Sequence, residues 1–197
     1  MSRPLLVVVG AVVFALMSVI FFWIFKLTLA NSMKTDMVSP EKVAAFIQAL
    51  LEANRNNYTD NVVVKLQKEG IQAHEHWKDE RGVALPAQYL MESGRLVAMK
   101  DLKFSFRLAS LTPIYVWNGP NSDFERLGLA AVDKNPDKPH YGYITKGSTR
   151  YFQAIYADRA GSQACVDCHN QHSNSPRRDF KLNDVMGGIV ITFPVGE

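Results

Sequence analysis

The sequence predicts an α+β domain that follows one apolar helix at the N-terminus. Three observations support this fold class. Residues 4–25 carry no charge, apolar residues between 40 and 69 recur at helical spacing, and from residue 104 onward apolar and polar residues alternate as in half-buried strands. Because the helices come first and the strands later, we expect an antiparallel sheet with flanking helices.

The apolar segment 4–25 is long enough to cross a membrane. Its 22 residues span about 33 Å at ~1.5 Å per residue, against ~30 Å for the hydrocarbon core. A signal peptide needs only ~7–15 apolar residues, so an uncleaved transmembrane helix is favoured over cleavage near residues 29–32. We therefore expect residues 1–30 to form a cytoplasmic tip and transmembrane anchor, 31–38 a linker, and 39–197 one domain.

Within the domain, helices and strands are predicted from the spacing of apolar residues and from capping, proline and glycine residues at their ends. Ser39 and Pro40 provide an N-cap and a first helical residue, which begins a helix over 40–56. Further helices are expected over 58–69, 86–93 and 122–132. Strands are expected over 104–108, 141–144, 149–157 and 188–193, with Gly147 and Ser148 as the turn of a hairpin.

The chain's two cysteines lie together in the run Cys165-Val166-Asp167-Cys168-His169. Two cysteines at this spacing can form thioether bonds to both vinyl groups of a haem, and the adjacent histidine can then ligate the iron. The sequence has no third cysteine to form a disulfide or supply a thiolate ligand. The motif therefore predicts one covalently attached haem c, held by Cys165, Cys168 and His169.

Two other interpretations use the same residues. A zinc site could be made from four ligands within eight residues: Cys165, Cys168, His169 and His172. Adjacent side chains point apart, however, so a tetrahedron that includes both Cys168 and His169 would strain the loop. A thioredoxin-like redox pair is typical of the start of a helix that follows a strand, and we expect no strand before residues 161–164. Such a pair also does not need His169.

Five segments of the domain resemble one family of proteins. They are Leu85-Pro86-Ala87, Asp123-Phe124-Glu125, Tyr151-Phe152-Gln153-Ala154, Cys165-Val166-Asp167-Cys168-His169-Asn170 and Asp184-Val185-Met186-Gly187-Gly188-Ile189-Val190. Together they resemble the haem c proteins with a PAS-like fold, which include cyanobacterial cytochromes and extracytoplasmic sensor domains of bacterial receptors. The resemblance covers residues 43–194. It implies a PAS-like antiparallel sheet, a haem between sheet and helices, and His169 as the proximal ligand.

The sixth iron ligand and the propionate partners are open to several candidates. The resemblance implies that the helix after Pro86 faces the haem, which makes Met91 the first candidate, although a buried methionine can simply fill the core. His74 and His76, expected on one side of an extended strand, are the second candidates, and the position can also be open. Arg177 and Arg150 are candidates to pair with a propionate, with a solvated loop as the alternative for Arg177.

These features favour a membrane-anchored monohaem cytochrome that transfers single electrons on the periplasmic side, alone or within a redox complex. Haem c is attached outside the cytoplasmic membrane, so we expect a bacterial inner-membrane protein with one span and a periplasmic domain. The alternative is a haem-based redox or gas sensor. A sensor would need a separate partner, because we expect no output domain after residue 197.

Composition limits the other function classes. The formal net charge of +3, with basic and acidic residues interspersed, does not indicate a nucleic-acid partner. No Ser/His/Asp set, phosphate-binding glycine loop or pair of carboxylates indicates an enzyme. The expected partners are a redox protein or membrane complex, the membrane through residues 4–25, and a second copy that could pair along the apolar face of the helix over 40–56.

Overall fold

The computed structural model describes residues 3–35 and 38–196. The chain divides into two units, one up to Ser39 and one from Pro40 onward. The first unit contains a single helix, α1 (Arg3–Thr35), which includes residues 31–35 of the predicted linker. Residues 36–37 of that linker, and residues 1–2 of the predicted cytoplasmic tip, lie outside the described residues.

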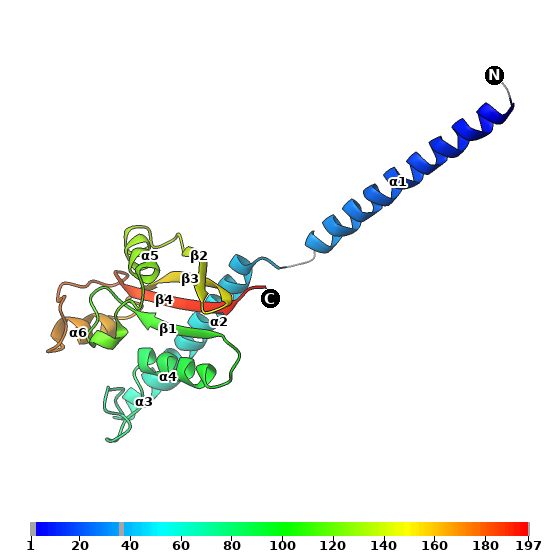
Figure 1. Ribbon diagram of the computed structural model, residues 1–197. Helices are drawn as coiled ribbons and strands as arrows, with labels where there is room; N and C mark the ends of the chain where they lie inside the picture. The colour runs from blue at the N-terminus through cyan, green and yellow to red at the C-terminus, as the bar shows by residue number, and fades with distance from the viewer. Residues whose placement is uncertain (1–2, 36–37, 197) are drawn as a thin grey trace. The chain divides into compact units, whose positions relative to one another are not determined.

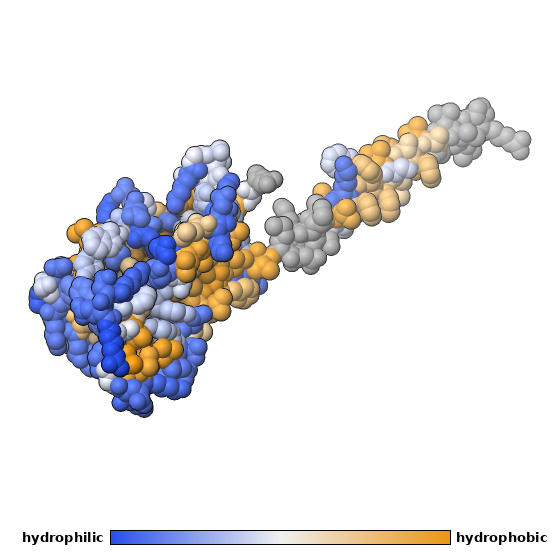
Figure 2. Space-filling view, turned by 90° about the horizontal axis from the view of Figure 1, so that it is seen from below, coloured by the Kyte–Doolittle hydropathy of each residue, from blue (hydrophilic) through white to orange (hydrophobic). Residues whose placement is uncertain are grey.

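Helix α1 contains a segment that is long and apolar enough to cross a membrane, Ala11–Leu29. Large apolar side chains along this segment are exposed in the structure, among them Phe14, Phe21 and Trp23. Figure 2 shows apolar residues along the visible surface of this helix. By length and composition, α1 is therefore a candidate membrane span.

The second unit contains a four-stranded antiparallel sheet flanked by helices, which confirms the predicted α+β class (Figure 1). The strand order is β1-β4-β3-β2. The strands are β1 (Ser105–Ala109), β2 (His140–Lys146), β3 (Thr149–Arg159) and β4 (Val185–Pro194). Strands β2 and β3 form the predicted hairpin, and the turn residue Gly147 has a φ of +61°, a conformation that suits glycine.

The helices before the sheet extend further than the sequence pattern predicts. Helix α2 (Pro40–Tyr58) continues through a π-helical turn (Thr59–Val63) into α3 (Val64–Lys68), so the two predicted helices form one continuous segment. Gly70, with a φ of +77°, follows its end. Helix α4 (Pro86–Ala98) begins at the predicted proline but passes the predicted end at residue 93, because Val97 still packs on the core.

Two helices follow the first strand. Helix α5 (Asp123–Lys134) is capped by Ser122, whose Oγ accepts the backbone N–H of Glu125 at 3.2 Å. Helix α6 (Gln163–Gln171) has no counterpart among the predicted elements. Its residues are mostly polar and only Val166 is buried, so the segment carries no apolar period from which a helix could be predicted. A short 3-10 turn, Val116–Asn118, completes the described helical elements.

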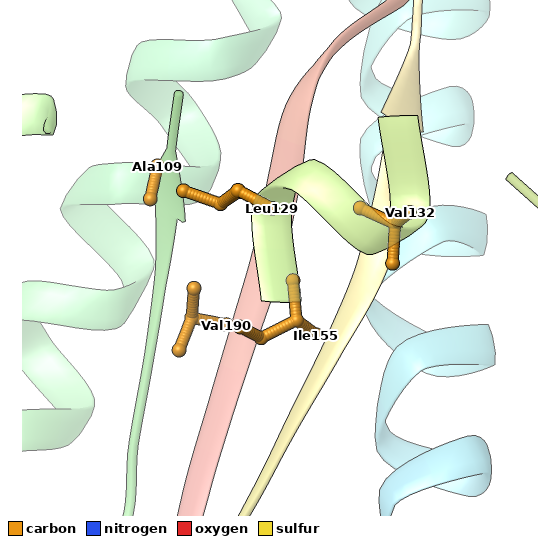
Figure 3. Packing of buried hydrophobic residues seen from close by; sticks show 5 residues of the cluster. All are labelled: Ala109, Leu129, Val132, Ile155 and Val190. Carbon is orange, nitrogen blue, oxygen red and sulfur yellow. The ribbon is translucent and has the colours of Figure 1, made fainter. Parts of the chain in front are cut away.

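Alternate residues of the strands face two separate hydrophobic layers. On β4, Ile189 and Ile191 pack with Leu90 of α4, whereas Val190 between them packs with Leu129 of α5. Figure 3 shows the residues of the α5 layer, which are Ala109, Leu129, Val132, Ile155 and Val190. The sheet is therefore covered by α2 and α4 on one face and by α5 on the other.

A buried ion pair joins α5 to the sheet. Arg107 of β1 pairs with Glu125 of α5, and the same Glu125 oxygen accepts the backbone N–H of Asn121 at 2.7 Å. Gln153 of β3 donates to the other Glu125 oxygen at 3.4 Å and to Thr192 Oγ1 at 2.9 Å. Because Glu125 is only 5% exposed, these contacts fix α5 over the sheet in surroundings that water screens little.

Candidate functional site

The predicted haem motif lies in the connection between β3 and β4. Residues 160–184 leave the sheet and return to it. The base of this excursion is closed by backbone hydrogen bonds from Ala160 to Asp184 and from Asn183 to Ala160, at 2.9 and 3.0 Å. Helix α6 lies within the excursion, beyond the end of β3 (Figure 1). The motif is therefore held on a short helix whose flanking segments are tied together.

The expectation that no strand precedes residues 161–164 is wrong. Strand β3 extends to Arg159, two residues past its predicted end, and α6 begins at Gln163. The strand is longer because β3 and β4 continue to pair beyond a register irregularity at Asp158/Arg159. The motif thus stands at the start of a helix after a strand, and its position no longer argues against a redox pair.

The structure places both cysteines of the motif on α6. Cys165 and Cys168 lie one helical turn apart, both half-buried and both with free thiols. Burial, strengthened by the charge of Glu75, raises the pKa of Cys168. In a Cys-x-x-Cys redox pair the attacking thiol is that of the first cysteine, so the raised pKa of Cys168, the second, does not argue against such a pair. Among the described residues, no three His, Cys, Asp or Glu side chains gather in an arrangement that could hold a metal ion such as zinc.

His169 is packed against the segment that follows α6. Its ring meets Phe180 edge-on, with 5.6 Å between ring centroids. The Asn170 side chain holds Phe180 in place, because Nδ2 donates to the Phe180 carbonyl at 2.9 Å and Oδ1 accepts the Phe180 N–H at 3.0 Å. The guanidinium of Arg177 lies 4.2 Å from the centroid of the Phe180 ring. Sequence analysis did not find Phe180, although Asn170 lies beside the motif.

The imidazole of His169 is neutral and incompletely paired. Its Nδ1 is buried and, among the described residues, has no hydrogen-bond partner. Burial lowers the pKa of His169 more than the charge of Asp158 raises it. A buried nitrogen without a partner costs about 1–3 kcal/mol, and a neutral imidazole is the form that ligates a metal. Two thiols and a neutral imidazole on one helix therefore fit the donor set of a c-type haem.

Three segments of the chain meet at Glu75, beside the end of α6. The Nε2 of His172 lies 3.3 Å from Glu75 Oε2, and the hydroxyl of Tyr115 donates to the same oxygen. The Nδ1 of His172 accepts the N–H of Asn174 at 3.1 Å, so in the neutral ring Nε2 carries the proton that is donated to Glu75. Tyr115 also stacks on Trp117, with 4.7 Å between ring centroids. Glu75 thereby connects its own loop, between α3 and α4, to the end of α6 and to the segment between β1 and α5 that carries Tyr115.

The two arginines predicted for the propionates lie in different places. Arg177 is on the excursion, where Nε donates to Asp179 at 2.7 Å and Nη2 to Asp184 at 3.3 Å. Arg150 is at the hairpin end of β3 and stacks on Tyr143, 4.0 Å from the ring centroid. The strand residues 150–159 separate it from α6 by about 30 Å at ~3.3 Å per residue, so the structure does not bring Arg150 to the motif.

The candidate distal ligands are also dispersed. Met91 is half-buried on α4. His74 and His76 do not lie on an extended strand, because only Ala73 forms an isolated bridge and a turn follows. His74 Nε2 lies 3.4 Å from the carbonyl of Arg81, and His76 is exposed beside Glu75. In the part of the chain that the structure describes, no hydrogen bond, ion pair or ring contact joins these three residues directly to α6.

A different methionine does pack against α6. Met186 of β4 is 8% exposed and belongs to a cluster with Val166 of α6 and Phe180. Cys165 is packed against the same cluster. Sequence analysis missed Met186, although it lies within one of the segments that carried the family resemblance. It adds a sulfur donor close to the helix that carries the motif.

An antiparallel sheet that carries a Cys-x-x-Cys-His helix between two of its strands defines a class of candidate c-type haem domains. Residues 33–194 match the model of the Tll0287-like family. Because this match covers most of the sequence, the chain belongs to the Tll0287-like family, and this membership points to a c-type haem domain. No curated protein matches the chain.

Proposed function

We propose that the chain is a membrane-anchored monohaem c-type cytochrome that transfers single electrons on the periplasmic side, as a carrier or a subunit of a redox complex, and not an enzyme. The observation that carries this proposal is the set of donor side chains on α6. Two thiols one turn apart and an imidazole with an unpaired buried nitrogen lie on one short helix. Membership of the Tll0287-like family supports the haem.

The residues of the chain have distinct roles in this proposal. Cys165 and Cys168 would hold the haem through thioether bonds, and His169 would ligate the iron. A bound haem supplies one-electron redox chemistry. Phe180 limits rotation of the His169 ring, and Asn170 fixes the backbone of Phe180 through two hydrogen bonds. A ligand held in this way moves little between oxidation states, which suits electron transfer.

The membrane anchor and the PAS-like fold are parts of the same proposal. The apolar segment Ala11–Leu29 supports a single span. The periplasmic side follows from where haem c is attached. A central antiparallel sheet with helices on both faces supports a PAS-like fold.

A second copy of the chain remains a predicted partner. Phe46 and Leu50 lie one turn apart on α2, and each is 66% exposed. This apolar face is the part of α2 along which two copies could pair. A redox protein or membrane complex is the other predicted partner, and the proposed electron transfer requires one.

The proposal is tested by absorption spectra of the detergent-solubilised protein in both oxidation states, with and without carbon monoxide. Wild type would be compared with Met91→Ala and Met186→Ala, with the exposed Met99→Ala as the matched control. We expect a six-coordinate c-type spectrum that resists carbon monoxide. Rapid carbon monoxide binding by the wild type would contradict the carrier and favour a sensor. An unchanged spectrum in a variant would remove that methionine as ligand.

A further inference from the structure

We propose that Glu75 lowers the reduction potential of this site, by holding a carboxylate charge beside the C-terminal end of α6. This inference rests on the proposed function, because it assumes that a haem is bound on α6. The residue lies outside the motif and outside every segment that carries the family resemblance.

Three hydrogen bonds hold Glu75, two at its carboxylate and one at its backbone carbonyl. His172, the C-cap of α6, and Tyr115 both donate to Oε2, at 3.3 Å for His172. The backbone carbonyl of Glu75 accepts a hydrogen bond at 2.9 Å from Nε2 of Gln88, in the first turn of α4. The side chain is 30% exposed, so water reaches only part of it. The charge is therefore held in one place and is incompletely screened.

The charge of Glu75 is not cancelled by its two donors on Oε2. The tyrosine hydroxyl is neutral, and the His172 ring donates its single proton while its Nδ1 accepts a hydrogen bond. His76 lies 3.3 Å from Oε1 but is 63% exposed, so water screens it strongly. The hydrogen bond from Tyr115, more than any other contact, holds the pKa of Glu75 below its ordinary value, which keeps the group ionised at neutral pH.

The charge also reaches the residues of the haem motif. The carboxylate lies beside His172, the C-cap of α6, whose backbone N–H donates to the carbonyl of Cys168 at 2.9 Å. A haem iron gains a unit of positive charge when it is oxidised, and a nearby carboxylate in partly desolvated surroundings favours that more positive state. Removal of the carboxylate should therefore make the reduced state easier to form.

The test uses Glu75→Gln in the full-length haem-loaded protein, with the reduction potential measured by spectroelectrochemistry at low salt and about pH 8. Glutamine keeps an acceptor oxygen for Tyr115 and His172 but has no charge. Asp101→Asn is the matched control, since it removes the same charge at a cleft shared with Lys146 and Tyr151, at the hairpin end of the sheet. Asp101 has a φ of 51°, which asparagine also tolerates. Tyr115→Phe removes a hydrogen bond but keeps the charge.

We expect a shift to more positive potential for Glu75→Gln, a much smaller shift for Tyr115→Phe, and none for Asp101→Asn. The shift should shrink as salt is added. Equal potentials for Glu75→Gln and wild type, both with full haem content, would overturn the inference and leave the proposed function intact. Equal shifts for Glu75→Gln and Asp101→Asn would also overturn it, because the effect would then be one of net charge. A wild type without covalent haem would instead contradict the proposed function.

Discussion

Glu125 and Glu75 both collect hydrogen bonds from several segments, but only one of them is paired with a fixed cation. Glu125 is 5% exposed and neutralised by Arg107 between α5 and the sheet. Glu75 receives hydrogen bonds from Tyr115 and His172 beside the helix that carries the haem motif. A carboxylate paired with its own cation stabilises the fold, whereas one that keeps its charge beside the end of α6 is placed to act on a group bound there.

The largest effect is expected at His169. His169→Ala should retain the covalently attached haem through Cys165 and Cys168 but lose the proximal ligand, so the reduced absorption spectrum should change to that of a five-coordinate or weakly ligated iron. His172→Ala is the matched control, three residues away on the same helix end, and should keep the wild-type ligation. The same spectral change in both variants would contradict the assignment of His169, and not His172, as the iron ligand.

Substitution of Glu125 should destabilise the fold much more than substitution of Glu75. Glu125→Gln leaves Arg107 without its partner, and we expect a loss of about 2 kcal/mol, below the roughly 3–5 of a fully buried pair because Arg107 is 27% exposed. Glu75→Gln keeps its neutral hydrogen bonds and should cost less than about 1 kcal/mol. Urea unfolding followed by circular dichroism measures both. Comparable losses would remove the distinction between the two carboxylates.

A further prediction concerns the rate at which the Cys168 thiol is alkylated. Because burial raises the pKa of Cys168, this thiol should react with iodoacetamide more slowly in the folded haem-free chain than in the unfolded chain. The rates would be followed by peptide mass spectrometry at about pH 8, with circular dichroism to verify that the haem-free chain is folded. Faster reaction in the folded state would show that burial does not raise the pKa of Cys168.

A smaller effect than that of Glu125→Gln is expected at the cap of α5. Ser122→Ala removes the side-chain acceptor of the Glu125 N–H and should lower the free energy of unfolding by about 1 kcal/mol. Ser173→Ala, in an exposed turn after α6, is the control and should be near neutral. Thermal unfolding would measure the difference, and a neutral Ser122→Ala would show that the Ser122 cap does not stabilise α5.

The sheet and three of the helices could be predicted because each has an apolar period. The alternation in β1 separates its two faces correctly, β4 is recognised as a short apolar run, and Pro40, Pro86 and Ser122 mark where α2, α4 and α5 begin. Helix α6 could not be predicted in this way, because its sequence is polar and its position depends on hydrogen bonds that close residues 160–184. The π-helical turn between α2 and α3 likewise leaves no local signal.

The part of the candidate site that is formed by consecutive residues could be predicted from the sequence. The motif on α6 is read from five consecutive residues, but Tyr115 and His172 meet Glu75 across 40 and 97 positions, and neither contact follows from composition. Arg150 was a reasonable propionate partner by chemistry alone. Its distance from α6 depends on the length and direction of β3, which the predicted strand did not relate to the motif.

The central claim is tested most directly by the intact mass of the denatured protein after expression with haem maturation. We predict a mass increased by one haem for the wild type, with absorption that resists acid–acetone extraction. Cys165→Ala combined with Cys168→Ala should lose all covalent haem. A wild-type chain without added mass, or one whose haem is fully extractable, would contradict the account.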